Sequence, residues 1–155
     1  MTTTLNLTEA PESAQWPQTH YVYVEKIGPF MQTAGQAWQT AHSLVPALSE
    51  HNKIVKYMSL YQRGPKIYRA GFALAEAPGK LPDGLAYTHF AGGKYSKFVL
   101  VGPYSDLPPA SGRVFEIVAE KNIAMRDDFC IEDYVTDPRT TPEEQTVTHI
   151  LIPAA

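Results

Sequence analysis

Ile27-Gly28-Pro29-Phe30 recurs 74 residues later as Val101-Gly102-Pro103-Tyr104. A second pair of similar segments, Tyr61-Gln62-Arg63-Gly64-Pro65 and Tyr134-Val135-Thr136-Asp137-Pro138, is separated by 73 residues. Because the two spacings nearly agree, the sequence predicts two related units and a pseudo-two-fold fold, with a cleft where the halves meet. Symmetry accounts for a fold, so positions at which the two copies differ are candidates for function.

Each copy shows the same succession of local patterns. A strand-forming segment ends at a Gly-Pro breaker, apolar residues at helical spacing follow, and two further strand-forming segments complete the copy. The pattern predicts an α+β fold of two pseudo-symmetric strand-helix-strand-strand repeats, with an antiparallel sheet and helices on one side. Strands are expected at 20–26, 56–62 and 67–75 in the first copy and at 94–100, 129–135 and 146–152 in the second, whose helix is expected at about 107–121.

The sequence also predicts the structure of the segments outside the core of the two repeats. Residues 1–18 are polar, with threonines and prolines, and are expected to form a flexible arm before a single domain at 19–155. The repeats are expected at about 20–76 and 85–155. An extra strand is expected at 85–90, and Gly92-Gly93 permits a sharp bend or bulge before the second copy.

Composition limits the classes of function. The 155 residues are 44% apolar and 19% charged, as in a globular domain. The net charge is −3 and the 13 basic residues are scattered, which argues against nucleic acid as a partner. We expect no further DNA-binding domain in a chain filled by two repeats.

Cysteine and histidine usage argues against a metal or a cofactor. Cys130 is the only cysteine, and no two of the five histidines stand at metal-ligand spacing on one predicted element. The N-terminus has no basic stretch followed by an apolar one, and no apolar run approaches membrane-spanning length. The sequence therefore predicts a cytoplasmic protein with no metal, no cofactor and no membrane partner.

Several motifs of the second half resemble one known family. The stretches that carry the resemblance are Ala91-Gly92-Gly93-Lys94-Tyr95, the Gly102-Pro103-Tyr104 turn, Phe129-Cys130-Ile131-Glu132-Asp133-Tyr134 followed by Asp137-Pro138, and Pro142-Glu143-Glu144 before a strand that ends at Ile152-Pro153. Together they resemble the GyrI-like small-molecule-binding domain, over about residues 19–154. That fold is shared by gyrase-inhibitory proteins and by effector-binding domains of multidrug-sensing transcription regulators.

The resemblance implies a binding residue. In that family the Glu of a Glu-x-Tyr strand lies in the ligand cleft, and Glu132 alone matches it, where the first copy has Ser59. Strand alternation points Cys130, Glu132 and Tyr134 to one side. The first-copy equivalents are Tyr57, Ser59 and Tyr61. The alternate set, Phe129, Ile131, Asp133 and Val135, is expected to pack under the helix, with Asp133 leaving that side partly exposed.

A carboxylate beside aromatic rings is poorly hydrated, so such a site raises the pKa of the acid or recruits a cation. Each tyrosine face adds a cation–π attraction of about 0.5–2 kcal/mol. We therefore expect Glu132 to bind an amphipathic, cationic small molecule. Trp38 is expected in the core or lining the cleft, Tyr104 in the core or at the cleft rim, and Cys130 as a small buried hydrophobe.

Three other functions remain open at this stage. The superfamily includes hydrolases of strained electrophiles, which would use Glu132 as general base with Tyr134 or Tyr61 as proton donor. The family precedent of gyrase implies a possible protein partner. Distant relatives of similar architecture imply haem binding, for which the sequence shows no defined histidine pocket.

Overall fold

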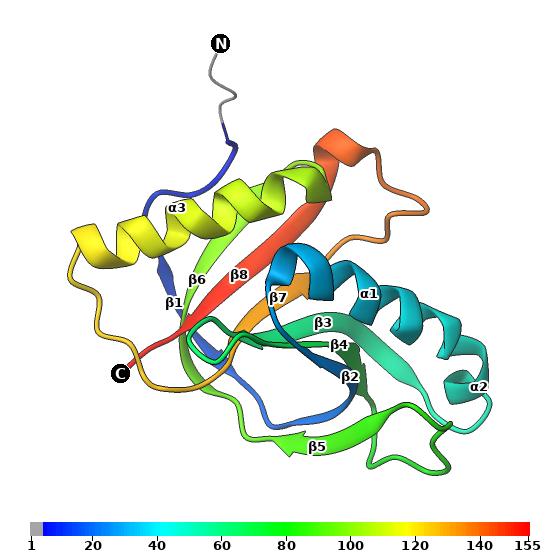
Figure 1. Cartoon of the computed structure of the whole chain (residues 1–155). Coiled ribbons are helices and arrows are strands. Elements are labelled where there is room, and N and C mark those ends of the chain that lie inside the picture. Colours follow the sequence, from blue (N-terminus) through cyan, green and yellow to red (C-terminus); the bar gives the residue numbers. More distant parts are fainter. Residues whose placement is uncertain (1–4) are drawn as a thin grey trace. The chain divides into compact units, whose positions relative to one another are not determined.

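The computed structural model describes residues 5–155, which form two compact units. Unit 1 comprises the chain up to Gln15 together with Lys94–Ala155, and unit 2 is Trp16–Gly93. The chain therefore leaves unit 1 after its first strand and returns to it at Lys94. Each unit is described on its own below, and Figure 1 labels the elements of both.

Unit 2 is an antiparallel sheet with helices packed against it (Figure 1). Its strands lie in the order β3-β4-β2-β5, and helix α1 packs on β2 and β4. Hairpin β3–β4 and the pairs β2–β4 and β2–β5 are all antiparallel. The elements are β2 (Thr19–Ile27), α1 (Phe30–Ser43), α2 (Val45–Ser49), β3 (Ile54–Gln62), β4 (Ile67–Leu74) and β5 (Ala86–Phe90).

Unit 1 has four strands in the order β1-β6-β8-β7, with β8 antiparallel to both β6 and β7. Its helix α3 follows a short 3-10 turn after β6. The elements are β1 (Glu12–Trp16), β6 (Gly93–Val101), η1 (Tyr104–Asp106), α3 (Leu107–Glu120), β7 (Cys130–Tyr134), η2 (Glu143–Gln145) and β8 (Val147–Pro153). The predicted α+β class with antiparallel strands is thus confirmed.

A glycine ends the first long strand of each unit. Gly28 has φ of +138° and Gly102 has φ of +151°, values that residues with a Cβ rarely adopt. The Gly28 N–H donates to the Lys66 carbonyl at 3.0 Å, and the Gly102 N–H donates to the Thr146 carbonyl at 2.8 Å. Both bonds tie the strand-to-helix turn to the residue that precedes a later strand of the same unit.

The N-terminal segment differs from the expected flexible arm. Residues Glu12–Trp16 form β1 beside β6, and the Thr8 N–H donates to the Val99 carbonyl at 3.0 Å. The Val99 N–H in turn donates to the Thr8 hydroxyl at 3.0 Å. Hydrogen bonding to β6 therefore outweighs the polar composition that predicted an arm. Residues 1–4 of that predicted arm lie outside the described residues.

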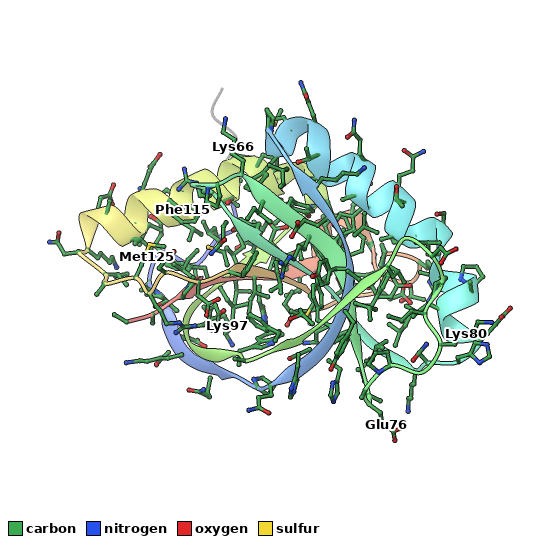
Figure 2. All side chains as sticks on the ribbon, turned by 60° about the horizontal axis from the view of Figure 1, so that its bottom comes forward. Lys66, Glu76, Lys80, Lys97, Phe115 and Met125 are labelled. Carbon is green, nitrogen blue, oxygen red and sulfur yellow. The ribbon has the colours of Figure 1, made fainter. Side chains whose placement is uncertain are left out.

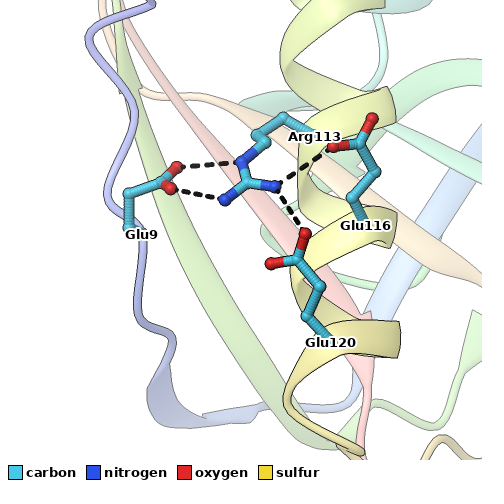
Figure 3. A network of polar contacts seen from close by, with 4 residues as sticks. All are labelled: Glu9, Arg113, Glu116 and Glu120. Atoms are coloured by element: carbon cyan, nitrogen blue, oxygen red, sulfur yellow. Dashed lines mark hydrogen bonds and ion pairs between the residues drawn. The ribbon is translucent and has the colours of Figure 1, made fainter.

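An ion-pair network fastens the same segment to α3 (Figure 3). The Arg113 guanidinium donates from Nη2 and Nε to the Glu9 carboxylate, at 2.7 and 3.3 Å. Its Nη1 donates to Glu116 and Glu120, both at 3.1 Å. The paired geometry with Glu9 is the bidentate form that planar guanidinium groups favour.

A buried tyrosine stands at the third position of the first long strand in each unit. Tyr21 is fully buried and its hydroxyl donates to the Met58 carbonyl at 2.9 Å. Tyr95 is also fully buried and donates to the Phe129 carbonyl at 2.9 Å. Burial raises the pKa of both hydroxyls, so each remains a neutral donor inside the core.

No helix within residues 5–155 combines the length and the apolar character needed to cross a membrane.

The bend expected at Gly92-Gly93 is confirmed, since Gly92 has φ of +71° and Gly93 φ of +126°. A Cβ on Gly92 would lie 2.2 Å from the Trp16 carbonyl oxygen. We expect Gly92→Ala to lower the free energy of unfolding by about 2–5 kcal/mol, through left-handed strain and overpacking. Urea unfolding measures this change.

Gly35→Ala in α1 is the matched control, because a Cβ there meets nothing within 4 Å. Glycine inside a helix destabilises it relative to alanine, so this control should be stabilised by up to about 1 kcal/mol. Equal stabilities of the Gly92→Ala protein and the wild type would contradict the close approach.

Candidate functional site

Glu132 and Tyr134 form a hydrogen-bonded pair on β7. The Tyr134 hydroxyl donates to Glu132 Oε1 at 2.7 Å. Both side chains are partly exposed, whereas Ile131 and Asp133 on the alternate face of the strand are buried. Burial raises the pKa of Glu132, and the hydrogen bond from Tyr134 partly opposes that rise.

The carboxylate has no cationic partner within the described chain. Its bond from Tyr134 is the one hydrogen bond or ion pair that Glu132 makes among residues 5–155. A carboxylate that loses water without gaining a cation or several donors is unfavourable in its ionised form. A cation or a hydrogen-bond donor beside Glu132 would therefore stabilise its ionised form.

A second aromatic ring stands beside this pair. Tyr104, in η1, contacts Tyr134 edge to face, with ring centroids 5.6 Å apart and an interplanar angle of 75°. Burial raises the pKa of Tyr104, and the nearby Asp137 carboxylate adds to that effect. Glu132 thus shares its strand face with Tyr134, whose ring packs against Tyr104.

The neighbouring strand presents one apolar and one hydroxyl-bearing residue to this pair. In the β7–β8 register Glu132 is opposite Ile150 and Tyr134 is opposite Thr148. Ile150 and Thr148 are fully buried. The Thr148 hydroxyl has no hydrogen-bond partner among residues 5–155, which leaves a buried polar atom one strand away from the pair. Cys130, whose thiol is buried, begins the same face.

The equivalent strand of unit 2 carries a different polar group. The Trp38 indole N–H donates to the Tyr68 hydroxyl at 2.9 Å and lies 3.2 Å from the Ser59 hydroxyl. Ser59 and Tyr68 are themselves hydrogen bonded at 2.7 Å. Ser59 is fully buried, so its hydroxyl is satisfied inside the unit.

Aromatic rings surround this hydroxyl cluster. Trp38 is nearly parallel to Tyr57, with an interplanar angle of 1° and centroids 6.3 Å apart. Phe72 meets Tyr57 edge to face at 4.8 Å. Phe30 meets Tyr61 edge to face at 5.7 Å, which matches the contact between Tyr104 and Tyr134 in unit 1.

The structure brings the predicted residues together in two groups. In unit 1, Glu132, Tyr134 and Tyr104 contact one another in sequence. In unit 2, Trp38 contacts Tyr57 and Ser59. Tyr61 has ring contacts with Phe30 and Tyr68, which also contact each other. Whether both groups serve one cleft stays a prediction.

One expectation about strand faces was wrong, and another stays a prediction. Asp133 is 4% exposed and does not open its side of β7 to solvent. The packing of Phe129, Ile131, Asp133 and Val135 under the helix stays a prediction. In unit 2 the face of β3 that holds Ser59 is the face that meets α1, through Trp38.

The sequence reasoning missed Phe30, Tyr68 and Thr148. Phe30 is aligned with Tyr104 by the repeated Gly-Pro segment, so that signal was available. Tyr68 and Thr148 become neighbours of the site through strand register, opposite Tyr61 and Tyr134. Register depends on tertiary packing, and no local pattern in the sequence reveals it.

Within residues 5–155 no group of three or more His, Cys, Asp or Glu side chains is placed to hold a metal ion.

The sequence profile of the GyrI-like small molecule binding domain matches residues 10–155. The chain therefore belongs to the GyrI-like family and carries its small-molecule-binding domain. The match starts nine residues before the expected domain boundary, in agreement with the ordered β1.

Several solved structures share the fold. The EcmrR C-terminal domain has a TM-score of 0.76 at 13% identity, with 99% of each chain covered. SAV2435 bound to tetraphenylphosphonium has a TM-score of 0.70 at 14% identity, covering 94% of this chain and 93% of that one. A hydrolase from Listeria innocua has a TM-score of 0.61 at 11% identity, covering 95% and 92%. No curated protein matches the sequence significantly.

Glu132→Gln provides a direct test of the burial of this carboxyl. A glutamate carboxyl in the unfolded chain has a pKa of about 4.3. When folding raises that pKa, the free energy of unfolding falls as pH rises from this value through the pKa of the folded protein. Glutamine keeps an acceptor for Tyr134 but cannot ionise. We expect the variant to be more stable than wild type at pH 7, with the difference vanishing below about pH 4.

Urea unfolding of both proteins between pH 4 and pH 7 checks this expectation. A stability difference that does not change with pH would mean that the Glu132 carboxyl is as well solvated in the folded protein as in the unfolded chain.

Proposed function

We propose that this protein binds an amphipathic, cationic small molecule through Glu132, and so senses or sequesters that compound. The observation that carries the proposal is a half-buried carboxylate whose one described partner is a neutral tyrosine hydroxyl. A bound cation would supply the charge that the unit itself does not provide.

The surroundings of the carboxylate favour a lipophilic cation over a small hydrated one. The Tyr134 and Tyr104 rings offer faces and edges for apolar contact, and the residue opposite Glu132 is the apolar Ile150. A cation over a tyrosine face gains about 0.5–2 kcal/mol, more when water is excluded. SAV2435, which shares the fold, has been solved with the lipophilic cation tetraphenylphosphonium, which is therefore the probe of choice.

Calorimetric titration with tetraphenylphosphonium tests the charge at Glu132. We expect Glu132→Gln to weaken binding by about 1–3 kcal/mol, or roughly 5- to 150-fold, because a buried charged partner is lost while the shape is kept. The control is Glu76→Gln, which removes the same charge from an exposed loop residue (Figure 2). Equal affinities for wild type and Glu132→Gln would reject the proposal.

The same titration should depend on pH in the wild type. As pH falls through the raised pKa of Glu132, the carboxylate gains a proton and its attraction for a cation is lost. Affinity should therefore decline at a higher pH than that at which an ordinary exposed glutamate titrates, and the Glu132→Gln protein should show no such decline. Parallel pH profiles for the two proteins would show that another group titrates.

We also propose that the aromatic residues Trp38, Tyr57 and Tyr61 of unit 2 contact a lipophilic ligand, with Ser59 next to them on β3. Their support is the partly exposed, nearly parallel pair formed by Trp38 and Tyr57. Tyr57→Leu should weaken tetraphenylphosphonium binding by about 0.5–2 kcal/mol through loss of one ring. Tyr87→Leu, on β5, is the control, and an identical effect of both changes would remove Tyr57 from the site.

A hydrolase of strained electrophilic molecules is the second candidate function. It is favoured by the raised pKa of Glu132, because a general base works best when its pKa lies near the operating pH. Glu132 would take a proton from the attacking water, and Tyr134 would supply one to the leaving atom. Turnover of a strained electrophile by wild type, lost in Glu132→Gln, would establish this function; binding without turnover would favour the first.

We further infer that the two units are copies of one repeat, as the sequence predicts. Both show the element order strand-helix-strand-strand and the same order of strands within the sheet, with a matching glycine bond and tyrosine contact. A superposition that places Gly28 and Gly102 in different turns would contradict this inference.

A further inference from the structure

Two histidines meet on the outer pair of strands in unit 2. His20 on β2 lies directly opposite His89 on the edge strand β5. Antiparallel partners project to the same face, and the two imidazole centroids are 4.8 Å apart with an interplanar angle of 13°. The sequence alone does not reveal this pair, because the two histidines are 69 positions apart and lie on different strands.

A tyrosine fixes one of the two rings. The Tyr87 hydroxyl lies 2.8 Å from His20 Nδ1. When Nδ1 carries the proton and donates to this oxygen, Nε2 holds the lone pair and faces away from the bond. Histidines that bind metals have this arrangement, with one nitrogen on the metal and the other donating to an oxygen that orients the ring.

The spacing of the rings suits chelation. A metal held at about 2.0–2.1 Å from one nitrogen of each ring lies roughly 3.2 Å from each ring centroid. Two centroids 4.8 Å apart then subtend roughly 100° at the metal, between the square-planar and tetrahedral angles. The His89 ring, which is exposed on an edge strand, must turn about χ2 to aim its lone pair at that position, and χ2 is a soft torsion in histidine.

We propose that His20 and His89 form a chelating site for a late first-row divalent metal ion such as Zn²⁺, with Tyr87 as the residue that positions His20. Imidazole nitrogen favours Zn²⁺, Ni²⁺ and Cu²⁺ over Ca²⁺ and Mg²⁺, which prefer oxygen ligands. Two protein ligands leave the remaining positions to water, which fits the exposed edge. This proposal is independent of the function assigned to Glu132.

Bound metal would have a structural consequence. It would crosslink β5 to β2 at the end of the unit 2 sheet, where β5 has a neighbouring strand of its unit on one side only. Because the metal would bind the folded pair and not the separated strands of the unfolded chain, it should stabilise the protein in proportion to the logarithm of its concentration. A thermal melt therefore reports binding without any assay of activity.

The test is a calorimetric titration of the full chain with Zn²⁺ at constant pH, with wild type, His89→Ala, His89→Gln and His20→Ala proteins. We expect one Zn²⁺ per wild-type chain and at least a tenfold loss of affinity in each histidine variant. His51→Ala, which removes an exposed histidine after α2, should bind as tightly as wild type. Tyr87→Phe should bind about 10- to 100-fold more weakly, the usual effect of losing an orienting partner.

Thermal melts with and without Zn²⁺ provide the second readout. Zn²⁺ should raise the midpoint of the wild type and of His51→Ala, but not that of either His89 variant, and the metal-free midpoints show that the variants fold. The proposal is overturned if the His89 variants retain wild-type affinity, or if the wild type binds no Zn²⁺. Unchanged affinity in Tyr87→Phe would remove Tyr87 as the positioning residue.

Discussion

In each unit one backbone hydrogen bond holds together the parts on which the candidate site depends. The glycine that ends the first long strand donates its N–H to the residue just before a later strand, from Gly28 to Lys66 and from Gly102 to Thr146. The positive φ of both glycines turns the chain out of the sheet at that point. An aromatic residue two positions later, Phe30 or Tyr104, is thereby placed edge to face with a tyrosine of the strand after the helix. A bulkier residue at the glycine would disturb both the turn and this ring contact.

The two units satisfy their polar groups in opposite ways. In unit 2 the Ser59 hydroxyl is enclosed by Trp38 and Tyr68, so the strand face is internally complete. In unit 1 the repeated sequence segments align Ser59 with Glu132. The residue opposite Tyr134 is the smaller Thr148, where Tyr61 is opposite Tyr68, and the Thr148 hydroxyl has no partner within residues 5–155. A carboxylate and a buried hydroxyl are thus left under-satisfied on neighbouring strands. Polar groups in this state favour ligand binding because a ligand can supply the missing interactions.

The edges of the two sheets are stabilised by different means. In unit 1 residues 6–8 and strand β1 pair with β6, and Glu9 between them is fastened to α3 by the Arg113 network. The segment covers an edge that would otherwise present unpaired backbone groups. In unit 2 the last strand is the short β5, whose outward side chains include His89 and Tyr87. Their contacts with His20 lie between strands and do not involve the helices. The two units therefore differ in the contacts of their edge strands, just as they differ in residue type at Ser59 and Glu132.

The sequence by itself determined the α+β class, the strands and helices of the two repeats to within a few residues, and the bend at Gly92-Gly93, because Gly-Pro breakers and residue periodicity act locally. The resemblance of its motifs to a known family gave the family and singled out Glu132, and strand alternation put Tyr134 on the same face. It failed for the N-terminal segment, where polar composition predicted an arm and hydrogen bonds to β6 order residues 6–8 and 12–16. The face that each helix covers, the placement of Tyr68 and Thr148 beside the site, and the meeting of His20 with His89 were decided only by the tertiary structure. Strand register and helix packing join residues far apart in the chain, and their free energy comes from contacts that no local segment contains.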